Sequence, residues 1–388
     1  MISRFGYRNR PPPGGAAHCE KRGIMNIRRV LVLCVAAALV GSGSPALFAQ
    51  APPKVDKKAE EKRSKNQQED VTALVQLVDQ VSTADPAGSP ADQAQGDVEI
   101  KWNFNHFMRA RESMAYVPFE LRVDRADLTS PNAAIYIRAV SRTAAPAAVP
   151  AAAAAPASNR DRNQPPAARP VYAWEFNYFV NVRADGAWQR AMELPAGEYD
   201  VFVAVKDQST GDKKQVAKTG LLRKRLTVPD YKAPGLVTSS IIAGGIEEMS
   251  SALSAQQQQE NPFVFGLLKL VPSVDAKFAK MSELTVIFLL YGAEADPVTT
   301  KPNVTVEYSF HQKTGETEKY FNKTSPQDLN AQTLPPDFSL AAGHQLQAAQ
   351  GVPLASFPAG DYRLEIKVTD KAAGKSVTRN VNFTVNAS

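Results

Sequence analysis

The sequence predicts an all-β protein built from two tandem sandwiches, on three observations. A Pro-Ala-Gly-acid-Tyr segment and the alternating strand after it occur twice, at 194–207 and again at 357–370, with a constant offset of 163 residues. Short apolar runs recur about every 8 to 15 residues, separated by turn-forming residues. Few segments show helical periodicity, so a fold of packed sheets is favoured over a mixed one.

Each copy of the repeat contains the residues expected where the chain turns from one sheet to the other. Pro195 and Pro358 hold φ near the turn value, and the glycine two residues later tolerates a positive φ. The tyrosine that follows can donate its hydroxyl to backbone a few residues upstream, as in the tyrosine corner of immunoglobulin-like sandwiches. We therefore expect structural tyrosine corners at Tyr199 and Tyr362, within two tandem immunoglobulin-like β-sandwiches.

Acidic side chains also recur in the repeat, at Glu198, Asp207, Asp361 and Asp370. A calcium loop places several carboxylates at two-residue spacing, and neither copy does so. An aspartate at the end of a strand commonly bonds its own turn. We interpret the four residues as structural rather than as a calcium or acid–base set.

The domain boundaries follow from changes in composition. The first sandwich is expected over 98–231 and the second over 232–388. An Ala/Pro-rich stretch at 143–170 interrupts the first, and we expect a disordered insertion there, because a longer loop adds little closure entropy.

Residues 1–51 have the features of a leader with a signal peptide. Basic residues follow Met25, an apolar run of eleven residues follows them, and an A-x-A cleavage pattern begins at Ala49. Met25 gives the better-proportioned signal peptide and is the expected start, although an extended basic n-region remains an alternative. Cys19 and Cys34 both precede the cleavage pattern, so the mature chain is predicted to be exported without a thiol, and Cys34 lacks the small preceding residue of a lipid-anchored protein.

Residues 52–97 are predicted to be a disordered linker that contains one short amphipathic helix at 69–82. Apolar residues lie at helical spacing in that helix, from Val71 to Val81. Its functional interpretation is a partner-docking or oligomer-forming helix. The alternative, which the sequence favours, is a helix that packs on the first sandwich or frays.

Charge and hydropathy exclude two classes of function. Removing the seven basic and one acidic residue of 1–51 from the totals of 45 and 39 leaves 38 of each, so the mature chain is formally neutral. A nucleic-acid binder needs a basic footprint. No later apolar run reaches membrane length, so no membrane insertion is expected after signal cleavage.

We find no catalytic motif, and we expect neither an enzyme nor a cofactor. The nucleophile elbow, the zinc-protease helix, the phosphate loop and the dinucleotide fingerprint are all missing from the sequence. His106, His311 and His344 are widely separated, and no metal site is predicted.

One strand is the best candidate for a binding face. Its aromatic residues alternate, at Tyr172, Trp174, Phe176 and Tyr178. Such a row can stack on sugar rings or on a partner's apolar ridge, but it is also what the core face of a sandwich requires. The carbohydrate alternative predicts a solvent-exposed Trp174. Strand addition at an open sheet edge is a further possibility.

The chain resembles a group of uncharacterised secreted proteins from Acidobacteria and related bacteria. The likeness lies in the segments 116–119, 226–240, 301–308 and 357–370, and it covers about 98–385. Similar sandwich segments accompany the GWxTD domain in other proteins, but the Gly-Trp-x-Thr-Asp motif does not occur here. The resemblance implies export and tandem sandwiches, and it adds no site.

Together these observations predict a non-catalytic adaptor or scaffold protein of the periplasm or cell surface. Its partner would be an envelope or extracellular protein. The alternative function is a carbohydrate-binding module that uses the aromatic strand at 172–178, with a glycan as its partner.

Overall fold

The computed structural model describes residues 57–84, 92, 94–111, 114–143, 147–149, 169–209 and 216–387. The expected leader at 1–51 and most of the expected insertion at 143–170 lie outside these residues. The described ends of the insertion include two short strands, β6 (Ala147–Val149) and β7 (Arg169–Val171), which pair with each other in antiparallel fashion.

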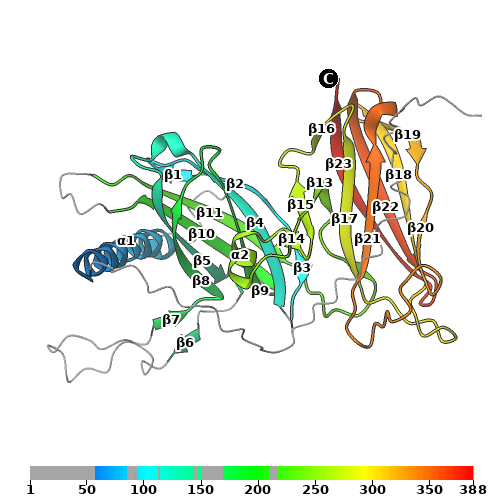
Figure 1. The fold of residues 1–388 in the computed structure, drawn as a ribbon, viewed down its shortest axis with the longest axis horizontal. Helices are drawn as coiled ribbons and strands as arrows, with labels where there is room; N and C mark the ends of the chain where they lie inside the picture. Colours follow the sequence, from blue (N-terminus) through cyan, green and yellow to red (C-terminus); the bar gives the residue numbers. More distant parts are fainter. Residues whose placement is uncertain are drawn as a thin grey trace, which may run out of the picture. The chain divides into compact units, whose positions relative to one another are not determined.

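The described chain is mostly β and forms two sandwiches of two sheets each (Figure 1). In the first sandwich, one sheet has the order β1–β11–β10–β5–β8 and the other contains β2, β4, β3 and β9. The bounds of these strands are β1 (Ala94–Gly96), β2 (Ile100–Asn105), β3 (Met108–Arg109), β4 (Met114–Val123), β5 (Asn132–Ser141), β8 (Trp174–Asn181), β9 (Ala187–Pro195), β10 (Gly197–Asp207) and β11 (Thr219–Val228).

The second sandwich repeats this plan with two six-stranded sheets. One contains β12 (Val237–Thr238), β13 (Ile242–Glu248), β14 (Val264–Phe265), β15 (Leu268–Pro272), β17 (Glu283–Tyr291) and β21 (Leu346–Pro353). The other contains β16 (Lys277–Ala279), β18 (Val304–Thr314), β19 (Thr317–Lys323), β20 (Gln327–Leu329), β22 (Gly360–Asp370) and β23 (Lys375–Asn386). A short helix, α2 (Ala255–Glu260), precedes β14, and 3-10 turns lie at Arg125–Asp127 and Leu354–Ser356.

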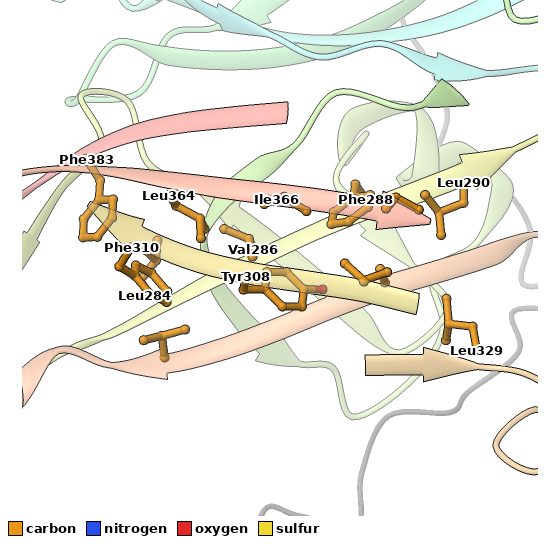
Figure 2. Packing of buried hydrophobic residues seen from close by; sticks show 14 of the residues in the cluster. Leu284, Val286, Phe288, Leu290, Tyr308, Phe310, Leu329, Leu364, Ile366 and Phe383 are labelled. Atoms are coloured by element: carbon orange, nitrogen blue, oxygen red, sulfur yellow. The ribbon is translucent and has the colours of Figure 1, made fainter. Parts of the chain in front are cut away.

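Each sandwich encloses its own hydrophobic core. The core of the first is drawn from residues 98 to 228, and that of the second from residues 236 to 385. Figure 2 shows the second core, where Phe288 of β17 and Tyr308 of β18 point into the same space as Ile366 of β22. Alternate residues of each strand supply these side chains, as the period of a strand requires.

Both copies of the repeat make the same turn with the same hydrogen bonds. The Tyr199 hydroxyl donates to the carbonyl oxygen of Pro195 at 3.0 Å, and the Tyr362 hydroxyl donates to that of Pro358 at 2.8 Å. This is the hydrogen bond that a tyrosine corner requires. The glycine between proline and tyrosine has a φ of 149° in the first copy and 145° in the second, which explains its recurrence.

The helix is longer than the sequence predicted. Helix α1 spans Lys57–Ala84, so it includes residues 57–68, which we expected to be disordered, and extends beyond 69–82. Leu74 and Val78 are fully buried against Phe202 and Leu221 on the outer face of the first sandwich. The spacing of apolar residues predicted the buried part of the helix. It did not predict the helical turns before residue 69, which are polar.

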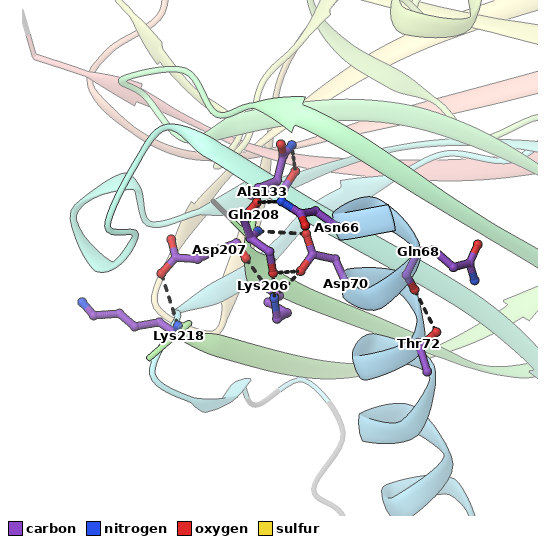
Figure 3. Close-up of polar contacts among 10 residues, drawn as sticks. Asn66, Gln68, Asp70, Thr72, Ala133, Lys206, Asp207, Gln208 and Lys218 are labelled. Atoms are coloured by element: carbon purple, nitrogen blue, oxygen red, sulfur yellow. Dashed lines mark hydrogen bonds and ion pairs between the residues drawn. The ribbon is translucent and has the colours of Figure 1, made fainter. Parts of the chain in front are cut away.

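Polar contacts also hold α1 to the sheet (Figure 3). Asp70 is buried, forms an ion pair with Lys206 of β10 and accepts a hydrogen bond from the backbone N–H of Ser209 at 2.9 Å. One turn earlier, the Asn66 amide donates to the Ser209 carbonyl at 3.1 Å. Because a buried carboxylate without partners is unfavourable, this pairing makes the position of the helix specific.

Candidate functional site

Strand β8 is the outermost strand of its sheet. It pairs with β5 in one continuous register, from Asn132 opposite Asn181 to Ala139 opposite Trp174. Among the described residues, no strand pairs with its other side. A strand in this position presents a row of backbone N–H and C=O groups that can accept another strand.

Three aromatic residues of β8 form a row that faces the inside of the sandwich. Trp174, Phe176 and Tyr178 lie opposite Ala139, Ile137 and Ile135 of the core-facing side of β5. Their rings stack in sequence, with centroids 5.7 Å and 5.4 Å apart and interplanar angles of 26° and 29°. Phe176 is nevertheless 56% exposed, because the facing sheet does not cover this edge.

Strand β9, the outermost strand of the facing sheet, closes one end of the row. The Trp188 ring packs edge-on against Tyr178 with centroids 5.0 Å apart. The Arg190 guanidinium lies 4.9 Å from the centre of the Trp188 ring and 5.2 Å from that of Tyr178. We call the five residues Trp174, Phe176, Tyr178, Trp188 and Arg190 the β8–β9 seam.

The electrostatics of the seam follow from its partial burial. Desolvation raises the pKa of the Tyr178 hydroxyl to about 12 and lowers the pKa of Arg190 from its usual value. Glu260 lies 3.6 Å from Arg190 and favours its charged form. The seam is therefore an apolar strip with one cation held against aromatic rings, a favourable arrangement for guanidinium groups.

Tyr172 does not belong to the row, which corrects the sequence-based set. The chain leaves strand geometry at residues 172–173, so the alternation that placed Tyr172 beside Trp174 is broken. Its ring lies over the Arg138 guanidinium, 4.0 Å from the centroid. Arg138 is buried and pairs with Asp79 of α1 at 2.5 Å, so Tyr172 takes part in the contact between helix and sheet.

Two of the four acids of the repeat, Asp207 and Asp370, bind backbone N–H groups. Asp207 is buried and accepts hydrogen bonds from the backbone N–H groups of Thr129 and Lys218, at 2.9 Å and 3.2 Å. Asp370 is buried and accepts from those of Glu294 and Ala372, at 2.8 Å and 3.0 Å. Within the described residues, no group of His, Cys, Asp and Glu has the geometry of a metal site.

The three histidines do not meet. His106 packs against Phe104, with ring centroids 5.5 Å apart, and His311 packs against Tyr320 at 6.0 Å. His344 accepts a hydrogen bond on Nδ1 from the backbone N–H of Ser339 at 3.1 Å. Each ring thus has a separate local environment, and together they form no convergent site.

A cleft of about 610 Å³ lies beside the segment that joins the sandwiches. Its lining includes Arg109, Tyr231 and Lys232. The Arg109 guanidinium is stacked 4.7 Å from the centre of the Tyr291 ring, and the Tyr231 hydroxyl donates to the Phe107 carbonyl at 2.8 Å. Arg109 and Tyr231 are therefore already used in contacts within the protein. The β8–β9 seam is the stronger candidate for a binding site.

Comparisons with known proteins leave the function open. No known protein-family profile and no curated protein sequence matches the chain. Among solved structures, trypsin-activated alpha-2-macroglobulin from Escherichia coli aligns at 10% identity and a TM-score of 0.21, over 77% of this chain and 17% of its own. Salmonella alpha-2-macroglobulin reacted with methylamine aligns at 11% identity and a TM-score of 0.19, over 76% of this chain and 17% of its own.

The chain therefore spans about a sixth of the length of these bacterial proteins. TM-scores this low support no inference about function or partners. The resemblance to secreted acidobacterial proteins stays a prediction. In the part of the chain described here, no helix combines the length and hydropathy that crossing a membrane requires.

Sequence analysis located the aromatic row but missed part of its surroundings. It placed Trp174, Phe176 and Tyr178 on one face, and the structure brings all three together. It gave no role to Arg190. The available signal was the alternation of Trp188 and Arg190 in the strand before the Pro195 turn, which puts both on one face.

Proposed function

We propose that this chain is an exported, non-catalytic adaptor or scaffold that binds another protein by strand addition to β8. The supporting observation is the open β8 edge, where Phe176 of the aromatic row is 56% exposed. Strand addition combines backbone hydrogen bonds with side-chain contacts at alternate positions. A strand added beside β8 would place every second side chain on the inner face, beside Trp174, Phe176 and Tyr178.

Strand β19 of the second sandwich shows how an edge is normally protected. It occupies the same position beside β18 that β8 occupies beside β5. Three of its seven residues are charged, and its register with β18 shifts at Phe310 and His311. Charges and bulges discourage strand pairing. Strand β8 has one charged residue in eight and no register shift, so it lacks both protections.

The side chains of β8 indicate the chemistry of the incoming strand. On the inner face, Phe176 favours an apolar neighbour. On the outer face, Glu175 is the only charged residue and is already within 3.5 Å of Arg138, so a small polar or basic neighbour fits there. The expected partner segment is an extended strand of an envelope or extracellular protein, apolar at alternate positions.

The ring geometry favours a protein partner over a glycan. Sugar rings stack on the open faces of aromatic side chains. Within the row the ring faces are turned toward one another, and Trp174 is half-buried rather than exposed. The seam therefore presents the edges of its rings to a partner, and ring edges suit contact with apolar side chains.

A photo-crosslinking experiment tests the proposal. The photoreactive residue p-benzoylphenylalanine replaces Asn177 in the full chain, and envelope extract is the source of partners. We expect crosslinks to one protein, at a segment with alternating apolar residues, and loss of these crosslinks when Phe176→Lys is added. The matched control is Tyr320→Lys, because Tyr320 is 54% exposed on the equivalent edge strand.

Three outcomes separate the candidate functions. Crosslinks that depend on Phe176 and not on Tyr320 support strand addition. Crosslinks that both variants retain would show that Phe176 does not contribute to binding, which contradicts the role proposed for the aromatic row. Retention of glycan or peptidoglycan fragments without any protein would instead support the carbohydrate-binding alternative.

A further inference from the structure

We propose that a second copy of this chain pairs with the β8 edge, giving a two-fold dimer in which two β8 strands run antiparallel. The inference rests on the proposed function, since it names an occupant of the same edge. Its basis is the sequence of β8. When two copies of this strand run antiparallel, the residues that lie opposite each other are compatible on both faces of the sheet.

On the inner face, a two-fold antiparallel pair would match aromatic residues. One residue lies opposite its own copy, and residues equally spaced on either side of it lie opposite each other. With Phe176 on the axis, Trp174 lies opposite Tyr178 of the other copy. Aromatic cross-strand pairs are among the favourable ones. The pairing would also cover Phe176, the most exposed ring of the row.

On the outer face, the same register avoids like charges. Glu175 lies opposite Asn177 of the other copy, so no carboxylate faces a carboxylate directly. Each Glu175 also has Arg138 of its own chain 3.5 Å away, a cation that it shares with Asp79. A single register thus satisfies both faces, and isologous contacts of this kind close at two copies.

Pairing between copies would compete with a partner strand for the same edge. An open edge strand is a hazard for uncontrolled association. A dimer that dissociates when a partner arrives would cover the edge in the meantime, which suits an adaptor protein.

Single-thiol crosslinking tests the register. The full chain carries Cys19→Ser and Cys34→Ser, which removes both natural cysteines. We expect Phe176→Cys to form a disulfide-linked dimer under mild oxidation, because directly opposed residues lie within disulfide reach. A mixture of Trp174→Cys and Tyr178→Cys should crosslink between the two variants. The control Asn177→Cys should not, because its own copy lies on a diagonal, beyond about 7 Å.

Light scattering at a series of concentrations tests the dimer without a crosslink. We expect a concentration-dependent dimer for the natural chain, and a dissociation constant about tenfold or more higher for Phe176→Lys, which sets two cations opposite each other. The matched variant Tyr320→Lys should leave the dissociation constant unchanged.

The outcomes separate this inference from the proposed function. A monomer at every concentration, with a thiol at position 176 that reacts freely with a reagent, overturns the dimer, while crosslinks to an envelope protein would still support the adaptor. A monomer whose thiol at that position is protected would show that another segment of the same chain covers the edge, which also overturns the dimer. A dimer without envelope crosslinks would retain the inference and remove the adaptor function.

Discussion

Each sandwich ends with an antiparallel hairpin, β10–β11 in the first and β22–β23 in the second, but the two hairpins differ in what covers their outer face. In β10, every residue from Tyr199 to Val205 is buried. The core covers the inner face, and on the outer face α1 covers Phe202 and Ala204 while Arg223 pairs with Asp200. In β22, only alternate residues are buried, and the outer face carries Glu365 and Lys367. The difference is already present in the sequence, since Phe202 and Ala204 occupy the matching positions of the first copy.

A similar contrast exists at the sheet edges, where β8 is apolar and regular and β19 is charged and bulged. What the two copies have in common is the corner, the buried aspartate and the core. What differs is on the surface. The comparison teaches that the shared residues maintain the fold, and that candidate functions are to be sought where the copies diverge.

The largest expected effect tests whether the shared aspartates are equivalent. We expect Asp207→Ala and Asp370→Ala each to lower the free energy of unfolding by about 3 kcal/mol, because buried N–H groups lose their acceptor. Calorimetry of the full chain measures this. Asp361→Ala, an exposed acid of the same hairpin, should change stability by less than about 0.5 kcal/mol. Unequal losses at Asp207 and Asp370 would break the equivalence of the two copies.

A pH titration tests the buried His106, which packs against Phe104 of the first sandwich and Phe263 of the second. Burial lowers the pKa of His106 to about 4, and its Nε2 has no hydrogen-bond partner among the described residues. Because the unfolded imidazole titrates near 6.5, the neutral form stabilises the fold above that pH, and stability falls as the pH drops toward 4. We expect a loss of about 2 kcal/mol.

The measurement is thermal unfolding of the full chain from pH 7.5 to pH 4. His106→Phe should reduce the slope over this range, since it removes the titrating group while keeping a ring. An unchanged slope in that variant would contradict the assignment to His106.

The tyrosine corners should contribute equally. Tyr199→Phe and Tyr362→Phe each remove one hydrogen bond to a proline carbonyl and keep the ring. We expect each to destabilise its own sandwich by about 1 kcal/mol. Chemical denaturation followed by limited proteolysis assigns each loss to a sandwich. Melting identical to that of the natural chain would show that these hydrogen bonds do not stabilise the fold.

The smallest effect on stability is expected at the exposed edge residues. Phe176→Lys and Tyr320→Lys should each change the free energy of unfolding by no more than about 0.5 kcal/mol, because both rings are more than half exposed. Thermal melts of the two variants check this. A large loss at Phe176 alone would mean that the aromatic row supports the core rather than a partner.

Much of the architecture could be predicted from local pattern. The Pro-Ala-Gly-acid-Tyr segments predicted two chain reversals, since proline and glycine constrain the backbone wherever they occur. The alternation after them predicted which side chains enter each core. The spacing from Val71 to Val81 predicted a helix, but not that it begins at Lys57, because the polar turns carry no periodic signal.

The sequence by itself determined the two sandwiches, their corners and that Trp174, Phe176 and Tyr178 share one face, without deciding whether that face belongs to the core. Only the tertiary structure decided that this core-facing row lies open at an edge, that Tyr172 covers Arg138 instead, and that Trp188 and Arg190 complete the seam. The physical reason is that alternation assigns a side chain to a face, whereas exposure depends on how far the opposite sheet extends. That extent is set by contacts between strands distant in the sequence.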